Sequence, residues 1–154
     1  MEYLWFKLLH ILSSTLLFGT GIGSAFYLLC VVLRRDVKVV ASVARVVVVA
    51  DWLFTATTAV IQPLTGWYLA HLMQLPWNTP WLSASLMLYA VAIACWLPVV
   101  KLQMLMRDSA TASAAAGEPL SPRFMRYFRA WFVLGFPALG AFLGIFWLMV
   151  FKPA

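Results

Sequence analysis

Four long apolar stretches decide what this chain can fold into. They cover residues 4–33, 46–72, 81–100 and 130–151. Because a bilayer core about 30 Å thick is crossed by roughly 20 apolar residues in a helix, each stretch is long enough to span a membrane. Hydrophobic residues make up 64% of the 154 residues and charged residues only 10%, which excludes a soluble globular domain. We therefore expect one all-α integral-membrane domain over residues 1–154, a bundle of four transmembrane helices.

Local signals predict how these helices begin, bend and connect. Residues 76–80 (PWNTP) predict a turn, and the small residues at 109–118 predict a flexible, solvated loop. Ser121 and Pro122 suit the N-cap and the first position of a helix. Pro63 predicts a kink in the second helix. Small residues four apart predict close helix contacts on the first and fourth helices: Thr15, Gly19 and Gly23, and Gly140 with Gly144.

The basic residues predict the orientation of the bundle. Nine of the 11 Lys and Arg side chains lie in the two connections that we place on one side: Arg34, Arg35, Lys38, Arg45, Lys101, Arg107, Arg123, Arg126 and Arg129. The other two, Lys7 and Lys152, lie near the chain ends. Since basic residues are retained on the cytoplasmic side, both ends should face outward, into the periplasm of a bacterial inner membrane. The basic residues behind the net charge of +6 then serve to orient the protein in the membrane, and nucleic acid is not an expected partner.

Several kinds of chemistry find no residues to perform them. The only cysteines, Cys30 and Cys95, lie inside apolar stretches and form no C-x-x-C pair. A zinc or thiol redox motif is therefore not indicated. Paired catalytic carboxylates, a phosphate-binding glycine loop and a nucleophile with its base are absent too, which excludes hydrolase and kinase chemistry of the soluble type.

The two histidines are the most informative polar residues. The predicted topology puts His10, in the first helix, and His71, at the end of the second, in the same half of the membrane. Two neutral imidazoles on neighbouring helices are what a six-coordinate b-type haem requires of a protein, so both are candidate iron ligands. At about 100° per residue, however, His71 points roughly 160° away from Asp51 and Gln62. If that polar face looks into the bundle, His71 looks out.

The helix face that carries His10 is small and polar. Lys7, Ser14 and Gly21 fall within roughly 60° of it on an ideal helix. Gly21 and Ser14 would leave room for a flat macrocycle, and Lys7 would pair with a haem propionate. The alternative is that His10 hydrogen-bonds a neighbouring helix and that His71 is an ordinary interfacial residue.

Asp51 is the only acidic residue well inside an apolar stretch. Charge at that depth costs about 2.5–3.5 kcal/mol on insertion scales, so Asp51 should have a partner or a proton. One hypothesis makes Asp51 a catalytic proton relay whose path continues along Thr55, Thr58 and Gln62. The other is a salt bridge to a nearby basic residue: Arg34, Arg35, Lys38 or Arg45.

Three segments carry a resemblance to known proteins. YLWFKLLHILSSTLLFGTGIGSAFY, QPLTGWYLA and WLPVVKLQMLMRD resemble a family of small predicted integral-membrane proteins of unknown function, over nearly all of the chain. That family looks distantly similar to four-helix membrane proteins of the HemJ and CopD type. HemJ proteins begin with a comparable pattern of lysine, two residues and histidine. The resemblance implies haem b and porphyrinogen oxidation, with His10 carried over as the candidate ligand. The later HemJ pattern is not matched by Trp96, Pro98 and Lys101.

Two classes of function follow. The first is a membrane protein that binds haem b and exchanges electrons with quinone or a porphyrinogen-like reductant. The second is a cofactor-free transporter, channel or accessory subunit. The lipid bilayer is the expected partner in both, and a homo-oligomer or a larger membrane complex fits either.

The orientation is directly testable with alkaline phosphatase fusions. A fusion after Ala154 should be active, because the chain end is predicted to face outward, and a fusion at Ala115 should be inactive. The reverse pattern of enzyme activity, at equal expression, would overturn the assignment.

Overall fold

The computed structural model describes residues 1–153 as helices joined by short turns. They are α1 (Glu2–Arg34), α2 (Val37–Ala50), the π-helical segment η1 (Asp51–Ala56), α3 (Thr57–Leu72), α4 (Pro80–Ala116) and α5 (Pro122–Phe151). Because α2, η1 and α3 continue one another, the molecule has four membrane-length helices, with no strand among the described residues. This confirms the predicted all-α fold with four helices long and apolar enough to span a membrane.

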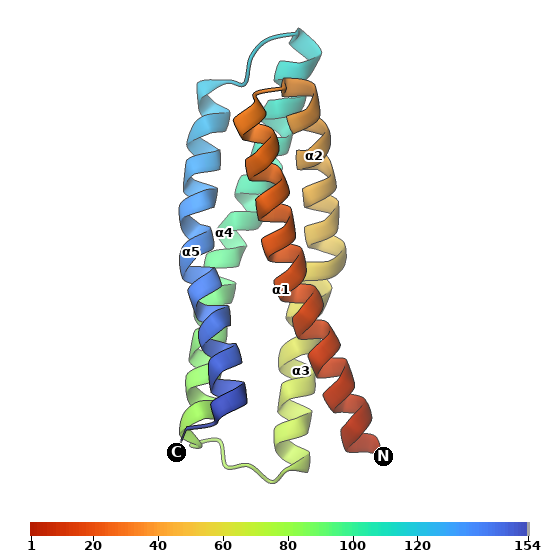
Figure 1. The fold of residues 1–154 in the computed structure, drawn as a ribbon, viewed down its shortest axis with the longest axis vertical. Helices are drawn as coiled ribbons and strands as arrows, with labels where there is room; N and C mark the ends of the chain where they lie inside the picture. Colours follow the sequence, from red (N-terminus) through yellow and green to blue (C-terminus); the bar gives the residue numbers. More distant parts are fainter. Residues whose placement is uncertain (154) are drawn as a thin grey trace.

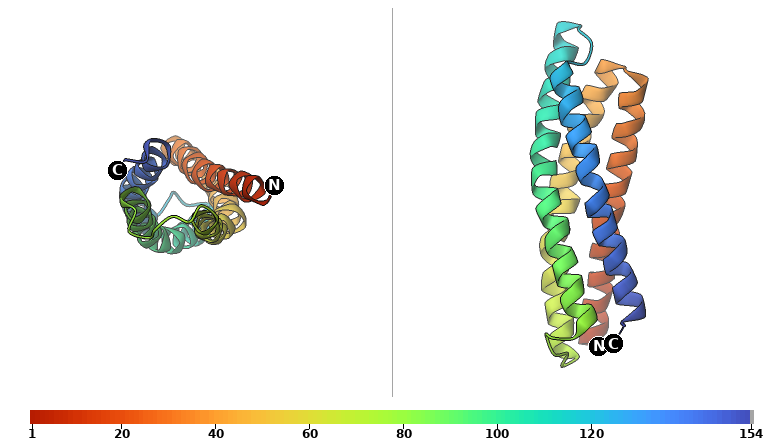
Figure 2. Two further views of the ribbon diagram at one scale, coloured as in Figure 1. Left: turned by 90° about the horizontal axis from the view of Figure 1, so that it is seen from below. Right: turned by 90° about the vertical axis from the view of Figure 1, so that its left-hand side faces the viewer.

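The four long helices run up and down in sequence order (Figure 1). Both chain ends and the turn between α3 and α4 lie at one end of the bundle, and the other two connections lie at the opposite end. Seen from the end, the helices surround a central axis, and α1 leans away from α5 toward the chain's N-terminus (Figure 2). Nine basic residues thus lie toward the end opposite the chain ends, which we call the basic end.

Side-chain caps define the helices at the basic end. The Asp36 carboxylate accepts hydrogen bonds from the backbone N–H groups of Lys38 and Val39, and only Arg35 and Asp36 separate α1 from α2. Ser121 Oγ accepts from the N–H of Phe124, with Pro122 in the first turn, which confirms the predicted start of α5.

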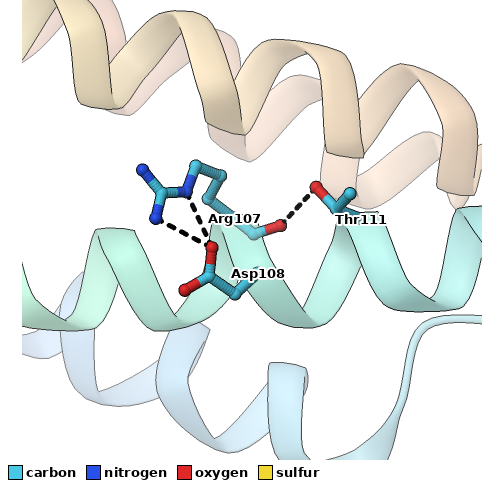
Figure 3. A network of polar contacts seen from close by, with 3 residues as sticks. All are labelled: Arg107, Asp108 and Thr111. Atoms are coloured by element: carbon cyan, nitrogen blue, oxygen red, sulfur yellow. Dashed lines mark hydrogen bonds and ion pairs between the residues drawn. The ribbon is translucent and has the colours of Figure 1, made fainter.

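Helices α2 and α4 extend further toward the basic end than predicted, and the expected loop at residues 109–118 was wrong. Helix α4 continues to Ala116 and ends at Gly117, whose φ of 69° suits a left-handed cap. Alanine is the best helix former, and Ala110 and Ser113 are buried here. A salt bridge between Arg107 and Asp108 lies on the exposed side of the same segment (Figure 3). Small residues therefore mark close packing in this segment.

The tightest packing is at the basic end. One cluster of buried side chains joins all four long helices: Leu28, Val32, Val40, Ala41, Ala44, Val47, Met106, Ala110, Phe124, Phe128 and Trp131. At about 1.5 Å per residue, the 37 residues of α4 measure roughly 55 Å, well beyond a bilayer core of about 30 Å. The bundle is therefore anchored at and beyond one membrane interface, while its middle is less tightly packed.

The predicted glycine contacts are mostly wrong. A Cβ built on Gly19, Gly23 or Gly140 would meet no neighbouring atom within 4 Å, so no other helix packs closely on these residues. Gly144 is the exception, because a Cβ there would lie 2.9 Å from Leu88 of α4. Pro63 lies inside α3, about two turns beyond the π-helical segment η1.

Replacing Ala110 with leucine should destabilise the bundle, because Ala110 has no exposed surface. Overpacking of this kind costs roughly 1–3 kcal/mol of unfolding free energy. Ala112→Leu is the matched control, since Ala112 is exposed on the same helix. Thermal unfolding in detergent should show a lowered Tm for Ala110→Leu only. Equal Tm values for the two variants would mean that the segment is not packed as described.

Candidate functional site

The polar face of the second long helix points into the bundle. Asp51, Thr55, Thr58 and Thr65 are all buried, and Gln62 is half-buried between them. Polar side chains in a membrane helix are costly unless they find partners, so they turn toward other helices. The polar face thus looks into the bundle, which was the condition under which His71 was expected to look out, and His71, on the other side of the helix, is exposed.

His10 closes a hydrogen-bonded network between α1 and α3. Its Nδ1 lies 2.8 Å from Thr65 Oγ1, and its Nε2 lies 3.2 Å from Gln62 Nε2. The Thr65 hydroxyl donates to the carbonyl of Ile61, so its oxygen accepts the N–H of His10 Nδ1. Ser13 Oγ donates to Gln62 Oε1, which directs the Gln62 N–H toward His10 Nε2. The network is therefore complete with a neutral His10 protonated at Nδ1.

The absence of a side chain at Gly66 lets His10 come close to the backbone of α3. A Cβ added to Gly66 would lie 3.2 Å from His10 Cε1, so the imidazole packs directly on the α3 backbone. Gly66 follows Thr65 in the chain, so the same turn of α3 supplies the oxygen that accepts from His10 Nδ1 and the room for the imidazole ring. His10 accordingly joins α1 to α3.

The structure does not bring His10 and His71 together. The His71 ring is stacked on Trp67 at 6.1 Å between centroids, on the exposed side of α3. Both ring nitrogens of His10 are occupied by Thr65 and Gln62, whereas an axial haem ligand must direct a free nitrogen lone pair at the iron. No cluster of three or more His, Cys, Asp or Glu suited to a metal ion occurs in residues 1–153. These residues do not fit a bis-histidine haem.

The other predicted haem-pocket residues are scattered. Lys7 is exposed, with its ammonium 5.7 Å from the centre of the Tyr3 ring. Ser14 donates to the carbonyl of Ile11 in its own helix, at 2.8 Å. Gly21 lies about three turns from His10 along α1 and lines a cavity that His10 does not touch. Lys7, Ser14 and Gly21 therefore share no site with His10.

Asp51 is bound by a tryptophan. Trp96 Nε1 of α4 donates toward both carboxylate oxygens, at 3.2 and 3.4 Å. In the part of the chain that the structure describes, the one salt bridge joins Arg107 to Asp108, so the predicted salt bridge from Asp51 to a basic residue is not formed (Figure 3). Asp51 is 4% exposed and opens the π-helical segment, a feature that occurs frequently at functional sites.

An apolar cavity of about 350 Å³ lies in the middle of the bundle, beside Trp96. It is lined by residues from α1, η1, α3, α4 and α5: Leu17, Gly21, Ile22, Ala25, Phe26, Leu29, Thr55, Ala59, Ala92, Ile93, Trp96, Val99, Gln103, Trp131, Phe132, Gly135, Phe136, Ala138, Leu139 and Phe142. Its volume is at the lower end of the range for ligand sites, about 300–1,000 Å³. The sequence analysis did not find this cavity, because its lining is drawn from every long helix.

Three unpaired polar atoms gather at this cavity. Gln103 Oε1 and Trp131 Nε1 are buried and form no hydrogen bond with any residue in 1–153, and Thr55 Oγ1, beside the Asp51 carboxylate, has no partner within ordinary hydrogen-bond distance. All three side chains line the cavity, and each is about 95% buried, with 4–5% of its surface exposed. Leaving such an atom unpaired costs about 1–3 kcal/mol. The cavity therefore has hydrogen-bonding capacity that the protein itself does not use.

The cavity borders the lipid between α1 and α5. Ile22 and Phe26 of α1 and Phe132 and Phe136 of α5 line it, and all four are exposed on the bundle surface. Toward the chain ends, Phe18 of α1 packs edge to face against Phe146 of α5, with 5.1 Å between ring centroids. The aromatic contact closes one end, so the open side faces the hydrocarbon of the membrane.

The four long apolar helices define a multi-pass integral-membrane protein. The chain belongs to the family described as predicted integral membrane protein (DUF2269), whose model matches residues 4–153. No curated protein and no solved structure matches the chain. The distant similarity to HemJ and CopD proteins stays a prediction from the sequence.

A double-mutant cycle tests whether His10 joins the two helices. His10→Ala and Thr65→Val should each lower stability, and the double variant should lose less than the sum, because the two side chains share one hydrogen bond. Interhelical hydrogen bonds in membranes contribute about 0.6 kcal/mol on average and at most about 1.7, so a coupling in that range is expected.

Unfolding by titration with a denaturing detergent measures each variant. Thr57→Val is the control, since Thr57 is exposed on the same helix and bonds only to its own backbone. Strict additivity of His10→Ala and Thr65→Val would contradict the network.

Proposed function

We propose that this protein binds a neutral, lipid-soluble molecule with a hydrogen-bonding head group in the cavity between α1 and α5. The observation that carries the proposal is the set of unpaired atoms on Thr55, Gln103 and Trp131, which all line this one cavity. A bound head group would satisfy these atoms and thereby gain the free energy that their burial costs.

The lining selects the charge and the hydrogen-bonding pattern of the ligand. None of the lining residues that the structure describes is charged, so an anionic phosphate or a cation would be bound without a counter-charge. The Trp131 indole can only donate, which calls for an acceptor such as a carbonyl oxygen. Gln103 and Thr55 can complement either a carbonyl or a hydroxyl group. A quinone or quinol ring has these groups and no charge.

The position of the polar atoms sets the orientation of the ligand. Gln103 and Trp131 lie at the end of the cavity nearer the basic end, whereas Leu17 and Phe142 make its other end apolar. A head group would thus lie toward the basic end. A tail would leave between Phe26 and Phe136 into the bilayer, so that a ligand reaches the cavity from the lipid.

The haem b hypothesis would require a different arrangement of α1 and α3. His10 would have to give up Thr65 or Gln62, and a second ligand would have to replace the outward-facing His71. The cofactor-free class, a carrier or an accessory subunit that presents a lipid-soluble molecule, agrees better with the cavity. We place this protein in a bacterial inner membrane, with its basic end toward the cytoplasm.

Binding of a short-chain benzoquinone, measured by equilibrium dialysis against protein in lipid nanodiscs, tests the proposal. The wild type should bind saturably, and Trp131→Phe should raise Kd about 2- to 12-fold, since it removes one hydrogen bond of about 0.5–1.5 kcal/mol but keeps the ring. Trp147→Phe is the control on the same helix, because Trp147 is 52% exposed and does not line the cavity.

Two results would overturn the proposal. One is that nanodiscs without the protein take up as much quinone as nanodiscs that contain it. The other is an equal Kd for Trp131→Phe and the wild type. An absorption spectrum of the same protein, produced in a haem-supplemented host, tests the haem hypothesis separately: a Soret band that His10→Ala abolishes would establish it.

A further inference from the structure

The polar atoms at the basic end of the cavity differ in what they can bind. Trp131 Nε1 can only donate a hydrogen bond, whereas Gln103 Oε1 is an amide oxygen and can only accept one. Both atoms are buried, and neither has a partner among residues 1–153. A ligand that pairs with both atoms must therefore accept one hydrogen bond and donate another. A single hydroxyl group does this, but a carbonyl oxygen does not.

Thr55 gives the cavity a second polar point, apart from the first. Its hydroxyl can donate or accept, so it pairs with either a hydroxyl or a carbonyl oxygen. Thr55 follows Asp51 by one turn, and the Asp51 carboxylate accepts from Trp96 of α4. Trp96 and Gln103 line the cavity from one face of α4, seven residues apart, which is about two turns or about 10.5 Å. The two polar points are separated by roughly this length.

This separation fits a six-membered ring with oxygen atoms at opposite positions. Such oxygens are about 5.5 Å apart, and a hydrogen bond of about 2.8 Å at each end extends the reach to about 11 Å. Trp96, Phe132 and Phe136 line the same cavity and would pack on the ring. A quinone and its quinol, which carries two hydroxyl groups in place of the two carbonyls, share this shape. Shape alone therefore does not choose between them.

Gln103 distinguishes the two forms. A quinol hydroxyl would donate to Gln103 Oε1 and accept from Trp131 Nε1 at the same time, so that both atoms are paired. A quinone carbonyl would pair with Trp131 only. Its lone pairs would then face the Gln103 oxygen, which would stay buried without a partner at a cost in free energy.

We propose that the cavity binds a quinol in preference to the corresponding quinone, and that Gln103 is the residue that selects it. This inference rests on the proposed function, because it specifies the ligand of the same cavity. One hydroxyl of the quinol pairs with Gln103 and Trp131, and the other pairs with Thr55. Binding of this kind moves no electron and no proton.

Equilibrium dialysis of two probes against protein in lipid nanodiscs tests the selection. Duroquinone and durohydroquinone have the same fully methylated ring, which does not react with cysteine thiols, and they differ in whether their oxygens can donate. Dialysis under argon keeps the quinol reduced. For the wild type, Kd for the quinol should be about 5- to 150-fold below Kd for the quinone, which is the factor that one unpaired buried acceptor costs.

Gln103→Met tests the selecting residue, because methionine keeps the length of the side chain but lacks the amide oxygen. Kd for the quinol should rise and Kd for the quinone should not, so the ratio of the two should fall at least about fivefold. Comparing this ratio between variants cancels the different partition of the probes into lipid.

Three further variants separate selection from binding and from folding. Trp131→Phe and Thr55→Val should weaken both probes and leave the ratio unchanged within about twofold, since these residues pair with either form. Ser113→Ala is the matched control on α4, because Ser113 is buried outside the cavity, and it should change neither Kd.

The selection and the proposed function fail on different results. Saturable binding of both probes with equal Kd, or a ratio that Gln103→Met does not change, would overturn the selection and leave the cavity as a binding site. No saturable binding of either probe would overturn both. Should Gln103→Met not fold, the wild-type ratio decides, with each Kd corrected for uptake of the probe by protein-free nanodiscs.

Discussion

Polar groups that lie inside a bilayer must find partners within the protein, and this constraint organises the whole bundle. The second long helix carries four buried polar side chains, Asp51, Thr55, Thr58 and Thr65, and burying them requires other helices around it. Helix α1 supplies His10 and Ser13 to Gln62 and Thr65, and α4 supplies Trp96 to Asp51. The contacts that satisfy the polar face are therefore also the contacts that hold the helices together.

The uneven packing of the bundle follows from where these contacts lie. The His10 network ties α1 to α3 toward the chain ends, while the apolar cluster around Met106 and Phe124 closes the basic end. Between these two tight regions, α1 and α5 leave a cavity that opens to lipid. A bundle joined at different levels by different pairs of helices can hold a ligand site in its middle without losing its fold.

The cavity and the inward polar face of the second long helix meet at one place. Thr55 lines the cavity and belongs to this polar face, and Trp96 lines the cavity while it donates to Asp51. A head group bound to Thr55 would therefore lie next to the Asp51 carboxylate.

What the sequence alone determined was set by local properties. Apolar length predicted four spanning helices, and the spacing of Asp51 to Gln62 put these side chains on one helix face, opposite to His71. Only the tertiary structure decided that both His10 nitrogens meet Thr65 and Gln62, and that Gln103 and Trp131 line one cavity. Burial also made residues 109–116 helical where composition predicted a loop. The physical reason is that periodicity defines the face of each helix, whereas the tilt and rotation that choose its partner depend on all the helices packing at once.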